Sequence, residues 1–361
     1  MDYAVIMAGG AGKRLWPLSR QDRPKQVLRL VDGKSLLRSC LERIEPVITQ
    51  ERVLVLTNRQ YLKIVKEELP GLDDNQVIAE PQMRDTCGAI GLAAAILHRS
   101  DPDATMAVIT ADQAIRPELT FQQVLQDGLR FVNSRPASLL TFGVRPRFPS
   151  TQLGYIKLSK AQSVSGCSNN VYLVDAFKEK PDLETATRYL AEGTYLWNSG
   201  MFVWKARRIL ELIARFVPEA AGPLEAIGRA WGGPSAAAVL EEQFPRLPKI
   251  SIDYAVMEKA SDIYAIELDC QWLDLGSYQA LAELMGRDES GNTLAADAGL
   301  LDCHDTIVVS EDKGHLIAGI GLEEMIIVHS PSATLVCPVG QADRLKELLE
   351  YLAAKGKGRY L

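Results

Sequence analysis

The sequence predicts an α/β protein with a mixed, mainly parallel sheet, followed by a small β-rich domain. Short apolar runs alternate with segments of helical spacing over residues 2–144, which is typical of strands joined by crossover helices. Glycines cluster directly after the first apolar run. From about residue 291 onward, short β-rich pieces recur at steps of roughly ten residues, which favours a meander, a sandwich or a small β-solenoid. The 361 residues suffice for two domains.

The first half of the chain is predicted to alternate strictly. Strands are expected at 2–7, 52–57, 76–80, 105–110 and 138–144, and helices at 34–47, 59–69, 86–99 and 119–132. In parallel sheets ligands bind beyond the carboxyl ends of the strands. We therefore expect the glycine cluster after the first strand, Glu80 at the end of the third and Asp112 after the fourth to gather along one edge.

The rhythm changes after residue 150, and we expect an insertion or second lobe over the same edge. Longer strands are expected at 153–158, 170–178 and 195–204, and helices at 182–192, 205–216 and 252–260. A domain boundary is predicted near 290, in the stretch ESGN, which divides the chain into residues 1–290 and 291–361. A final helix within DRLKELLEYLAA precedes a basic tail.

Composition excludes several classes of protein. A formal net charge of −6 argues against bulk nucleic-acid binding. The six cysteines are scattered and form no C-x-x-C pair, which predicts no zinc site, no disulfide framework and a reducing cytoplasm. The N-terminus lacks the basic region of a signal peptide, and no apolar run approaches the ~20 residues that cross a bilayer. We expect a cytoplasmic protein without membrane partners.

Residues 7–26, MAGGAGKRLWPLSRQDRPKQ, are the first candidate site. A Walker A loop fails, because Arg14 follows the Gly-Lys pair and Met7 stands where the first glycine belongs. A dinucleotide fingerprint is weak, because Leu15 occupies the third glycine position, although Asp32 lies at the expected distance. A surface turn with stray cations is the plain alternative.

A broad phosphate cradle explains more of this segment. Glycines let backbone N–H groups approach a polyphosphate closely. Arg14 and Lys25 place positive charge where the charge of a leaving group would develop. The two prolines hold a long loop extended, so this interpretation accounts for the glycines, cations and prolines together.

At this point the sequence resembles the mannose-1-phosphate guanylyltransferase (GDP-mannose pyrophosphorylase) family of sugar-nucleotide nucleotidyltransferases. The resemblance is carried, in order, by GGAGKRLWPLSRQDRPKQ, EPQMRDT, TADQAI, FGVRPRFPSTQLGYI, FKEKP, WNSGMFVW, SIDYAVMEK and WLDLGSY. It implies a Rossmann-like nucleotidyltransferase domain and a C-terminal left-handed β-helix-like domain. The length implies the short form without a fused isomerase domain, and the family favours a homodimer.

The family reaction joins GTP and mannose 1-phosphate to give GDP-mannose and pyrophosphate. The resemblance implies in-line attack of the sugar phosphate on the α-phosphate, assisted by Mg²⁺ and without a covalent intermediate. Catalysis would then rest on positioning and charge neutralisation.

The resemblance also assigns roles to residues. Four would be catalytic, and the two acids among them would hold the metal ion: Arg14, Lys25, Asp112 and Asp274. The nucleotide would be bound by the loop glycines and by residues around EPQMRDT: Gly9, Gly10, Gly12, Glu80, Asp85 and Thr86. The Glu80 carboxylate could accept hydrogen bonds from guanine N1–H and N2–H₂.

The sugar phosphate would be bound by residues from three later motifs: Gly154, Glu179, Lys180 and Asn198. Pro181 is expected to keep Lys180 extended. Asn198 can donate and accept, which suits a pair of sugar hydroxyls. The four histidines lie outside the motifs and receive no catalytic role.

Two positions depart from the family pattern. Asp85 stands where an asparagine is usual, and an aspartate cannot donate an amide hydrogen bond. Gln113 stands where a histidine is usual, and a glutamine cannot titrate. These departures leave two alternatives open: a transferase for another nucleotide or sugar 1-phosphate, and a non-catalytic protein that binds a sugar nucleotide. The presence of both acids and both loop cations argues against the second.

Overall fold

The computed structural model describes residues 1–10, 12–30, 33–162, 164 and 166–361, so Asp32 lies outside the described residues. The chain forms two compact units. Unit 1 consists of Met1–Gly9, Cys40–Ala111 and Ile115–Gln271. Unit 2 consists of Gly10–Ser39, Asp112–Ala114 and Trp272–Leu361. Among the described residues, no helix combines the length and apolarity needed to cross a membrane.

Unit 1 is built on a nine-stranded sheet in the order β3-β2-β1-β4-β9-β6-β10-β8-β7. The strands are β1 Asp2–Met7, β2 Val53–Asn58, β3 Val77–Glu80, β4 Thr105–Thr110, β6 Leu139–Val144, β7 Tyr155–Gln162, β8 Val171–Lys178, β9 Tyr195–Lys205 and β10 Ile263–Glu267. Only β8 and β9 run against the others. The predicted mixed, mainly parallel sheet is confirmed.

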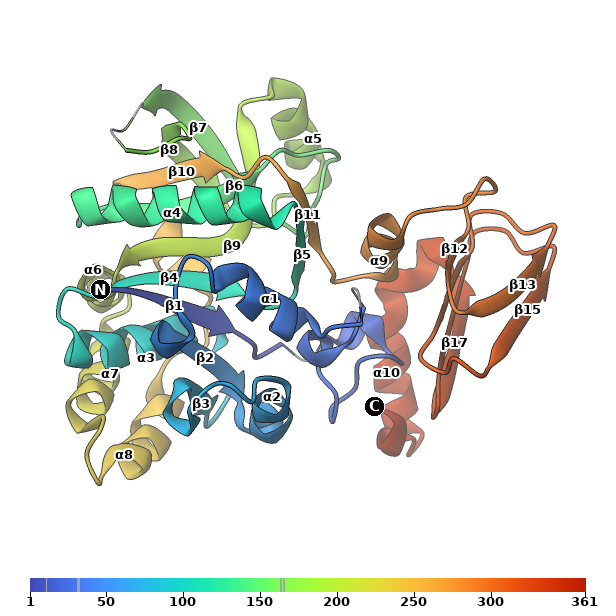
Figure 1. The fold of residues 1–361 in the computed structure, drawn as a ribbon, viewed down its shortest axis with the longest axis horizontal. Coiled ribbons are helices and arrows are strands. Elements are labelled where there is room, and N and C mark those ends of the chain that lie inside the picture. Colours follow the sequence, from blue (N-terminus) through green and yellow to red (C-terminus); the bar gives the residue numbers. More distant parts are fainter. Residues whose placement is uncertain (11, 31–32, 163, 165) are drawn as a thin grey trace. The chain divides into compact units, whose positions relative to one another are not determined.

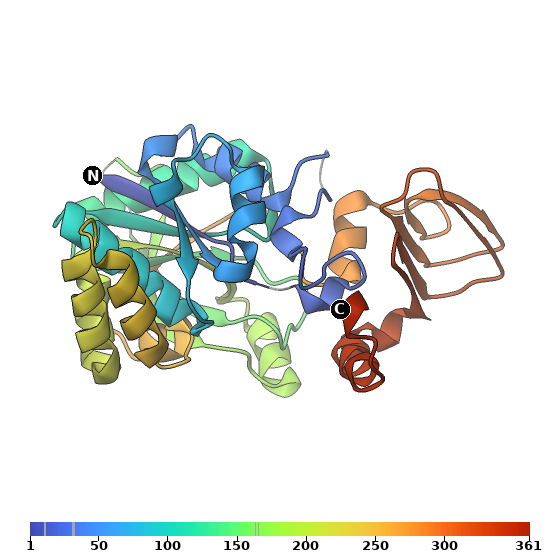
Figure 2. The same ribbon diagram turned by 90° about the horizontal axis from the view of Figure 1, so that it is seen from below.

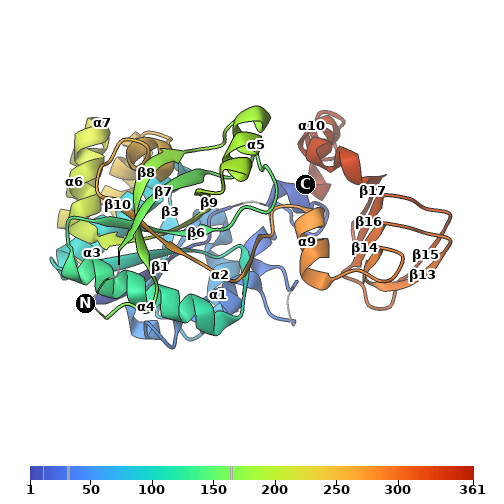
Figure 3. The same cartoon turned by 90° about the horizontal axis from the view of Figure 1, so that it is seen from above.

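Helices cover both faces of this sheet (Figure 1). The helix α4 (Glu118–Ser134) lies on one face, and α3 (Asp85–Ser100), α6 (Ala206–Phe216) and α7 (Pro218–Ala230) lie on the other, as the perpendicular views also show (Figures 2 and 3). Because α3 is apolar on nearly every side, it is buried between the sheet and this outer layer. A Cβ at Gly91 would stand 2.8 Å from Leu224 Cδ1, so glycine permits the close packing of α3 on α7.

The remaining helices of unit 1 are shorter. They are α2 (Leu62–Glu68), α5 (Leu183–Glu192) and α8 (Ala236–Gln243). All five strands expected in the first half are present, and so are its helices, including α1 (Leu36–Ile44). The expectation of a second lobe after residue 150 is wrong, because β7, β8 and β9 hydrogen-bond into the same sheet.

Unit 2 contains the expected short strands of the C-terminal part. A four-stranded sheet has the order β12 (Thr293–Ala295), β14 (Ile307–Ser310), β16 (Met325–Ser330) and β17 (Ala333–Pro338). A second sheet pairs β13 (Asp297–Leu301) with β15 (Leu316–Ile320) in parallel. The helices are α9 (Tyr278–Met285) and α10 (Leu345–Ala354). The two-stranded pair β5 (Gln113–Arg116) and β11 (Gln271–Asp274) was not expected.

The core of unit 2 joins segments that are distant in sequence. Residues of α9, β14, β16 and α10 are buried together with Leu15, Trp16 and Leu18 of the glycine-rich segment and with Leu28, which follows it. Burying four large side chains removes several hundred Å² of apolar surface from water, at ~25 cal/mol per Å². The glycine-rich segment is therefore part of the packed core of unit 2.

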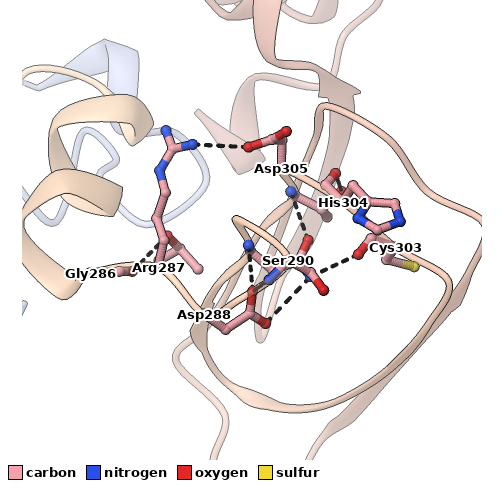
Figure 4. Close-up of polar contacts among 10 residues, drawn as sticks. Gly286, Arg287, Asp288, Ser290, Cys303, His304 and Asp305 are labelled. Atoms are coloured by element: carbon pink, nitrogen blue, oxygen red, sulfur yellow. Dashed lines mark hydrogen bonds and ion pairs between the residues drawn. The ribbon is translucent and has the colours of Figure 1, made fainter.

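The stretch around residue 290 is held by a polar cluster (Figure 4). Asp288 Oδ1 accepts hydrogen bonds from the N–H groups of Ser290 and Asn292, at 2.9 and 2.8 Å. The buried Asn292 side chain donates to Cys303 O at 2.9 Å and accepts from Thr306 N at 3.0 Å. Hydrogen bonds therefore hold this segment in a fixed turn. The domain boundary that the sequence places there stays a prediction.

Candidate functional site

Three charged side chains meet in unit 2. Lys25 Nζ lies 3.2 Å from Asp112 Oδ2 and 3.0 Å from Asp274 Oδ1. Only 6% of the Lys25 side chain is exposed, against 33% and 42% for the two acids. One predicted catalytic cation and both predicted metal-binding acids therefore form one cluster, with the acids at its open side.

The cluster depends on backbone that brings distant segments together. Asp112 directly precedes β5 and Asp274 ends β11, and Leu275 N donates to Asp112 O at 3.3 Å. Lys25 begins a short 3₁₀ helix, Lys25–Val27, after Pro24. Burial alone would lower the pKa of Lys25, but the two carboxylates outweigh it and hold that pKa above its usual value. Lys25 is therefore a permanent cation.

The glycine loop is shaped around Lys25. Gly12 has a φ of 66°, in the left-handed region, and a Cβ there would stand 2.5 Å from Lys25 Cβ. The Ser19 hydroxyl donates to Gly12 O. A Cβ at Gly10 would stand 3.1 Å from the side-chain nitrogen of Gln26. Arg14 lies exposed on a 3₁₀ turn, Lys13–Leu15.

The loop is also held from the C-terminal part of unit 2. Tyr278 Oη donates at 2.9 Å to Leu15 O and lies 3.0 Å from Trp16 O. The indole N–H of Trp16 donates to Tyr360 O at 2.7 Å. Hydrogen bonds thus hold the loop to α9 and to the C-terminal residues that follow α10.

Glu80 lies in unit 1, at the end of β3. Its carboxyl group is buried, with 7% of the residue exposed, and a Cβ at Gly9 would stand 3.5 Å from Glu80 Oε1. Burial, reinforced by the nearby charge of Asp85, raises the pKa of Glu80 to about 8. Near pH 7 this carboxyl group is mostly protonated. Of the predicted nucleotide residues, Thr86 already accepts a hydrogen bond from Ile252 N through its hydroxyl, at 2.8 Å.

The predicted sugar-phosphate residues also lie together in unit 1. Lys180 Nζ pairs with Glu179 Oε1 at 2.9 Å, and a Cβ at Gly154 would overlap Glu179 Oε2. Asn198 N donates to Gly154 O at 2.8 Å. Lys180 has a φ of 45°, so the expectation that Pro181 keeps it extended is wrong. The turn that aims Lys180 is left-handed instead.

The amide of Asn198 has fewer free positions than the sequence suggested. Its oxygen accepts from Gly200 N at 3.2 Å and lies 3.0 Å from Thr141 Oγ1, whose single hydrogen is shared with Met201 O, also at 3.0 Å. Its nitrogen donates to Asp253 Oδ1 at 3.0 Å. The bond from Gly200 occupies one lone pair of the oxygen, and one N–H of the amide remains for a ligand. The amide is thus partly engaged by its neighbours, and the expectation that it donates to and accepts from sugar hydroxyls stays a prediction.

Sequence reasoning missed two residues at these places. Asp253 stands within the quoted SIDYAVMEK, and burial with the nearby charge of Glu179 raises its pKa to about 7. Gln26 follows Lys25 in the loop motif, and its buried Oε1 has no hydrogen-bond partner among the residues that the structure describes. A polar residue inside a motif was the only signal for either.

The chain is similar to known proteins over nearly its whole length. The nucleotidyl transferase family profile matches residues 3–291, and the MannoseP isomerase/GMP-like beta-helix domain profile matches residues 299–352. The mannose-1-phosphate guanylyltransferase of Klebsiella pneumoniae is 36% identical over 99% of this chain and 75% of its own length. The chain belongs to the mannose-1-phosphate guanylyltransferase family. The expected family and the expected fold are confirmed.

Two further proteins are similar to this chain over nearly its whole length. The xanthan biosynthesis protein XanB of Xanthomonas campestris pv. campestris is 37% identical over 98% of this chain and 73% of its own length. A crystal structure from Thermus thermophilus, described as a mannose-1-phosphate geranyltransferase, is 31% identical, with a TM-score of 0.87 over 98% of this chain and 99% of its own. This member of the family is thus a nucleotidyltransferase by descent.

The acid pair suits the divalent metal that nucleotidyltransferases generally use. Mg²⁺ prefers oxygen ligands and is usually held by one or two carboxylates, with substrate phosphates and water completing its shell. Asp112 and Asp274 already share one cation, the Lys25 ammonium group, so their oxygens converge on a single place. Among the described residues no group of three or more His, Cys, Asp or Glu side chains could hold a metal ion, so two carboxylates are the fullest set.

Proposed function

We propose that the protein transfers GMP from GTP to mannose 1-phosphate. A phosphate oxygen of the sugar phosphate would form a bond to the α-phosphorus of GTP, and the bond from that phosphorus to the β-phosphate oxygen would break. The products are GDP-mannose and pyrophosphate. One observation carries the proposal. Lys25 forms ion pairs with Asp112 and Asp274, and the two acids are partly exposed to solvent beside the glycine loop.

The loop would hold the triphosphate. Backbone N–H groups of Gly9, Gly10 and Gly12 would bind phosphate oxygens, and Arg14 and Lys25 would neutralise the charge that develops on departing pyrophosphate. Because Lys25 is buried and fixed by two ion pairs, its ammonium needs little reorganisation during the reaction.

Asp112 and Asp274 would hold Mg²⁺. When bound, the ion supplies positive charge that offsets the negative charge of the phosphate oxygens. The protein's own contribution is to fix two carboxylates at one place. The Mg²⁺ requirement is part of this proposal.

The base and the sugar would be selected by residues of unit 1. Ionised Glu80 would accept from guanine N1–H and N2–H₂, and Asp85 and Thr86 would complete the nucleotide site. Lys180 would bind the sugar phosphate, Glu179 would accept from sugar hydroxyls, and Asn198 would donate one N–H. Gly154 leaves room for Glu179 and the sugar.

A panel of substrates tests the proposal. Purified protein with Mg²⁺, GTP and mannose 1-phosphate should release pyrophosphate, and no release across pH and metal conditions would reject the activity. The raised pKa of Glu80 and the Asp85 substitution favour a second candidate, transfer from another nucleotide. A large kcat/KM preference for UTP or dTTP over GTP would establish that candidate instead.

We further propose a homodimer in the cytoplasm. Support for self-association comes from β13 and β15, where Leu301, Leu316 and Ile320 are more than half exposed on the outer face. Analytical ultracentrifugation of the wild type and of Ile320→Lys tests this, because a wild-type monomer would reject it.

A further inference from the structure

A buried side-chain bond joins two residues that are close in sequence to the acid pair. The indole N–H of Trp272 donates to Gln113 Oε1 at 2.8 Å. Only 3% of Trp272 and 6% of Gln113 is exposed to solvent. Gln113 immediately follows Asp112, and Trp272 stands two residues before Asp274. The bond therefore joins β5, which directly follows Asp112, to β11, which ends at Asp274.

The chemistry of this bond fixes which atoms are used. An indole nitrogen donates only, so the atom that faces it must be the amide oxygen of the glutamine. A buried donor that loses its acceptor is unfavourable, which makes the bond sensitive to the residue at position 113. The side-chain bond adds to the backbone pairing of β5 with β11 and to the bond from Leu275 N to Asp112 O at 3.3 Å.

Strand geometry connects this bond to the carboxylates. Side chains at positions i and i+2 of a strand point to the same face, so Trp272 and Asp274 share a face of β11. A shift of Trp272 would therefore move Asp274 with it. Leu273 on the opposite face is buried against Leu275 and Ala114, which leaves the strand little freedom to turn.

We propose that the Gln113–Trp272 bond is a positioning device that sets the spacing of Asp112 and Asp274 for a divalent cation. This inference rests on the proposed function. Gln113 acts through Asp112 and Trp272 through Asp274, and neither touches the reacting atoms. The role requires a side-chain hydrogen-bond acceptor at position 113 and does not require a group that titrates. A glutamine meets this requirement.

The variants separate the acceptor from the bulk of the side chain. Gln113→Met keeps the length and removes the acceptor, Trp272→Phe removes the donor, and Gln113→His offers a neutral ring nitrogen as a replacement acceptor. Gln76→Met is the matched control. It removes a glutamine amide that joins other segments in unit 1, where it donates to Gln50 O and Val53 O.

The first measurement concerns the bond itself. Trp272→Phe identifies the Trp272 indole N–H signal in a ¹H–¹⁵N spectrum. In Gln113→Met that signal should move upfield, and in Gln76→Met it should not move. An unchanged position in folded Gln113→Met would overturn the proposal, because the indole would have no bond to lose.

The second measurement concerns the cation without turnover. The dissociation constant of GTP is measured with and without Mg²⁺, and the ratio reports how much the ion strengthens binding. Loss of an outer partner of a metal ligand weakens metal affinity by ~10–100-fold. We expect the ratio to shrink to that extent in Gln113→Met and Trp272→Phe, no further in the double variant, and to recover in Gln113→His.

The outcomes distinguish the two proposals. If the ratio falls in Asp112→Asn but stays within about twofold of wild type in folded Gln113→Met and Trp272→Phe, the positioning role is overturned and the proposed function stands. If wild type shows neither a Mg²⁺ effect on GTP binding nor pyrophosphate release, the proposed function itself fails. An equal loss in Gln76→Met would also count against the positioning role, because a general loosening would explain it.

Discussion

Gly12 lies so close to Lys25 that no larger residue fits between them. A Cβ at Gly12 would stand 2.5 Å from Lys25 Cβ and 3.2 Å from its backbone nitrogen. Gly12 also has a left-handed φ of 66°, which side chains rarely adopt. The glycine therefore sets the position of Lys25 as well as the shape of the loop.

Replacing Gly12 with alanine should displace Lys25 from the acids. Gly12→Ala should lower kcat by roughly 10–100-fold, because a catalytic charge that is displaced by about 1 Å loses much of its effect on the reaction. Steady-state rates of pyrophosphate release measure this. Gly33→Ala is the control, since it also has a positive φ but no heavy atom within 4 Å of its Cβ. Equal activity in the two variants would contradict the prediction.

Removing the Lys25 ammonium should act mainly on the chemical step. We expect Lys25→Ala to lower kcat by roughly 100–1000-fold, the usual loss when one fixed stabiliser of developing charge is removed. Lys13→Ala removes an exposed cation from the same loop and should change kcat by less than about threefold. A similar loss in both variants would show that only the net charge of the loop matters.

GTP binding should strengthen as the pH rises toward 8. The buried Glu80 has a pKa of about 8, so below that pH it is mostly neutral and cannot accept from both guanine N–H groups. The carboxylate forms as the pH rises through 8, and the dissociation constant of GTP should fall until the pH exceeds that value. Isothermal titration between pH 6 and 9 measures it.

Two variants isolate Glu80 from the titration of GTP itself. Glu80→Gln should remove this part of the pH dependence. Asp85→Asn takes away a like charge that raises the pKa of Glu80, so it should move the midpoint to lower pH and tighten binding at pH 7. A wild-type profile that coincides with the Glu80→Gln profile would refute the role of Glu80.

Asn198 and its partners should affect the sugar phosphate and leave GTP unaffected. Asp253→Ala removes the acceptor that holds the Asn198 nitrogen, and we expect the KM for mannose 1-phosphate to rise by about tenfold, equivalent to ~1.4 kcal/mol. Thr141→Val removes the hydroxyl that lies 3.0 Å from the Asn198 oxygen and should have a smaller effect in the same direction. An equal rise in the KM for GTP would contradict a role of Asn198 that is specific to the sugar phosphate.

The turn shown in Figure 4 should contribute to stability alone. Asn292→Ala leaves Cys303 O and Thr306 N without their buried partner, which costs about 1–3 kcal/mol per group. The melting temperature should fall. The exposed neighbour Glu289→Ala is the control and should change stability by less than about 0.5 kcal/mol. An unchanged melting temperature in Asn292→Ala would contradict the buried network.

Local patterns were enough to predict most of unit 1. The strand Thr105–Thr110 was expected at those residues because a short apolar run between polar segments has few other interpretations. The helix Pro218–Ala230 was missed, since Pro223 and two glycines inside it are ordinary signals of a loop. Packing on α3 decides that helix, and the sequence of the segment alone does not contain that information.

The site shows the same division. Motifs pointed to Lys25 and Asp274 separately, but 249 residues separate them, and no local rule predicts that their side chains lie 3.0 Å apart. The tie between Trp272 and Gln113 was missed for this reason. The hydrogen bonds that engage the Asn198 oxygen were not predicted either, because one comes from Gly200 on the same strand and Thr141 lies on another.

Packing of the glycine-rich segment against the C-terminal half of unit 2 limits how members of this family can be recombined. Leu15 and Trp16 are buried with α10 and β16, and their carbonyls face Tyr278. In a hybrid enzyme that takes its C-terminal segment, Trp272–Leu361, from a relative, the loop of this chain would pack against side chains of the relative. Residues 10–39 should therefore be exchanged together with that segment, as one inherited module made of two pieces of chain.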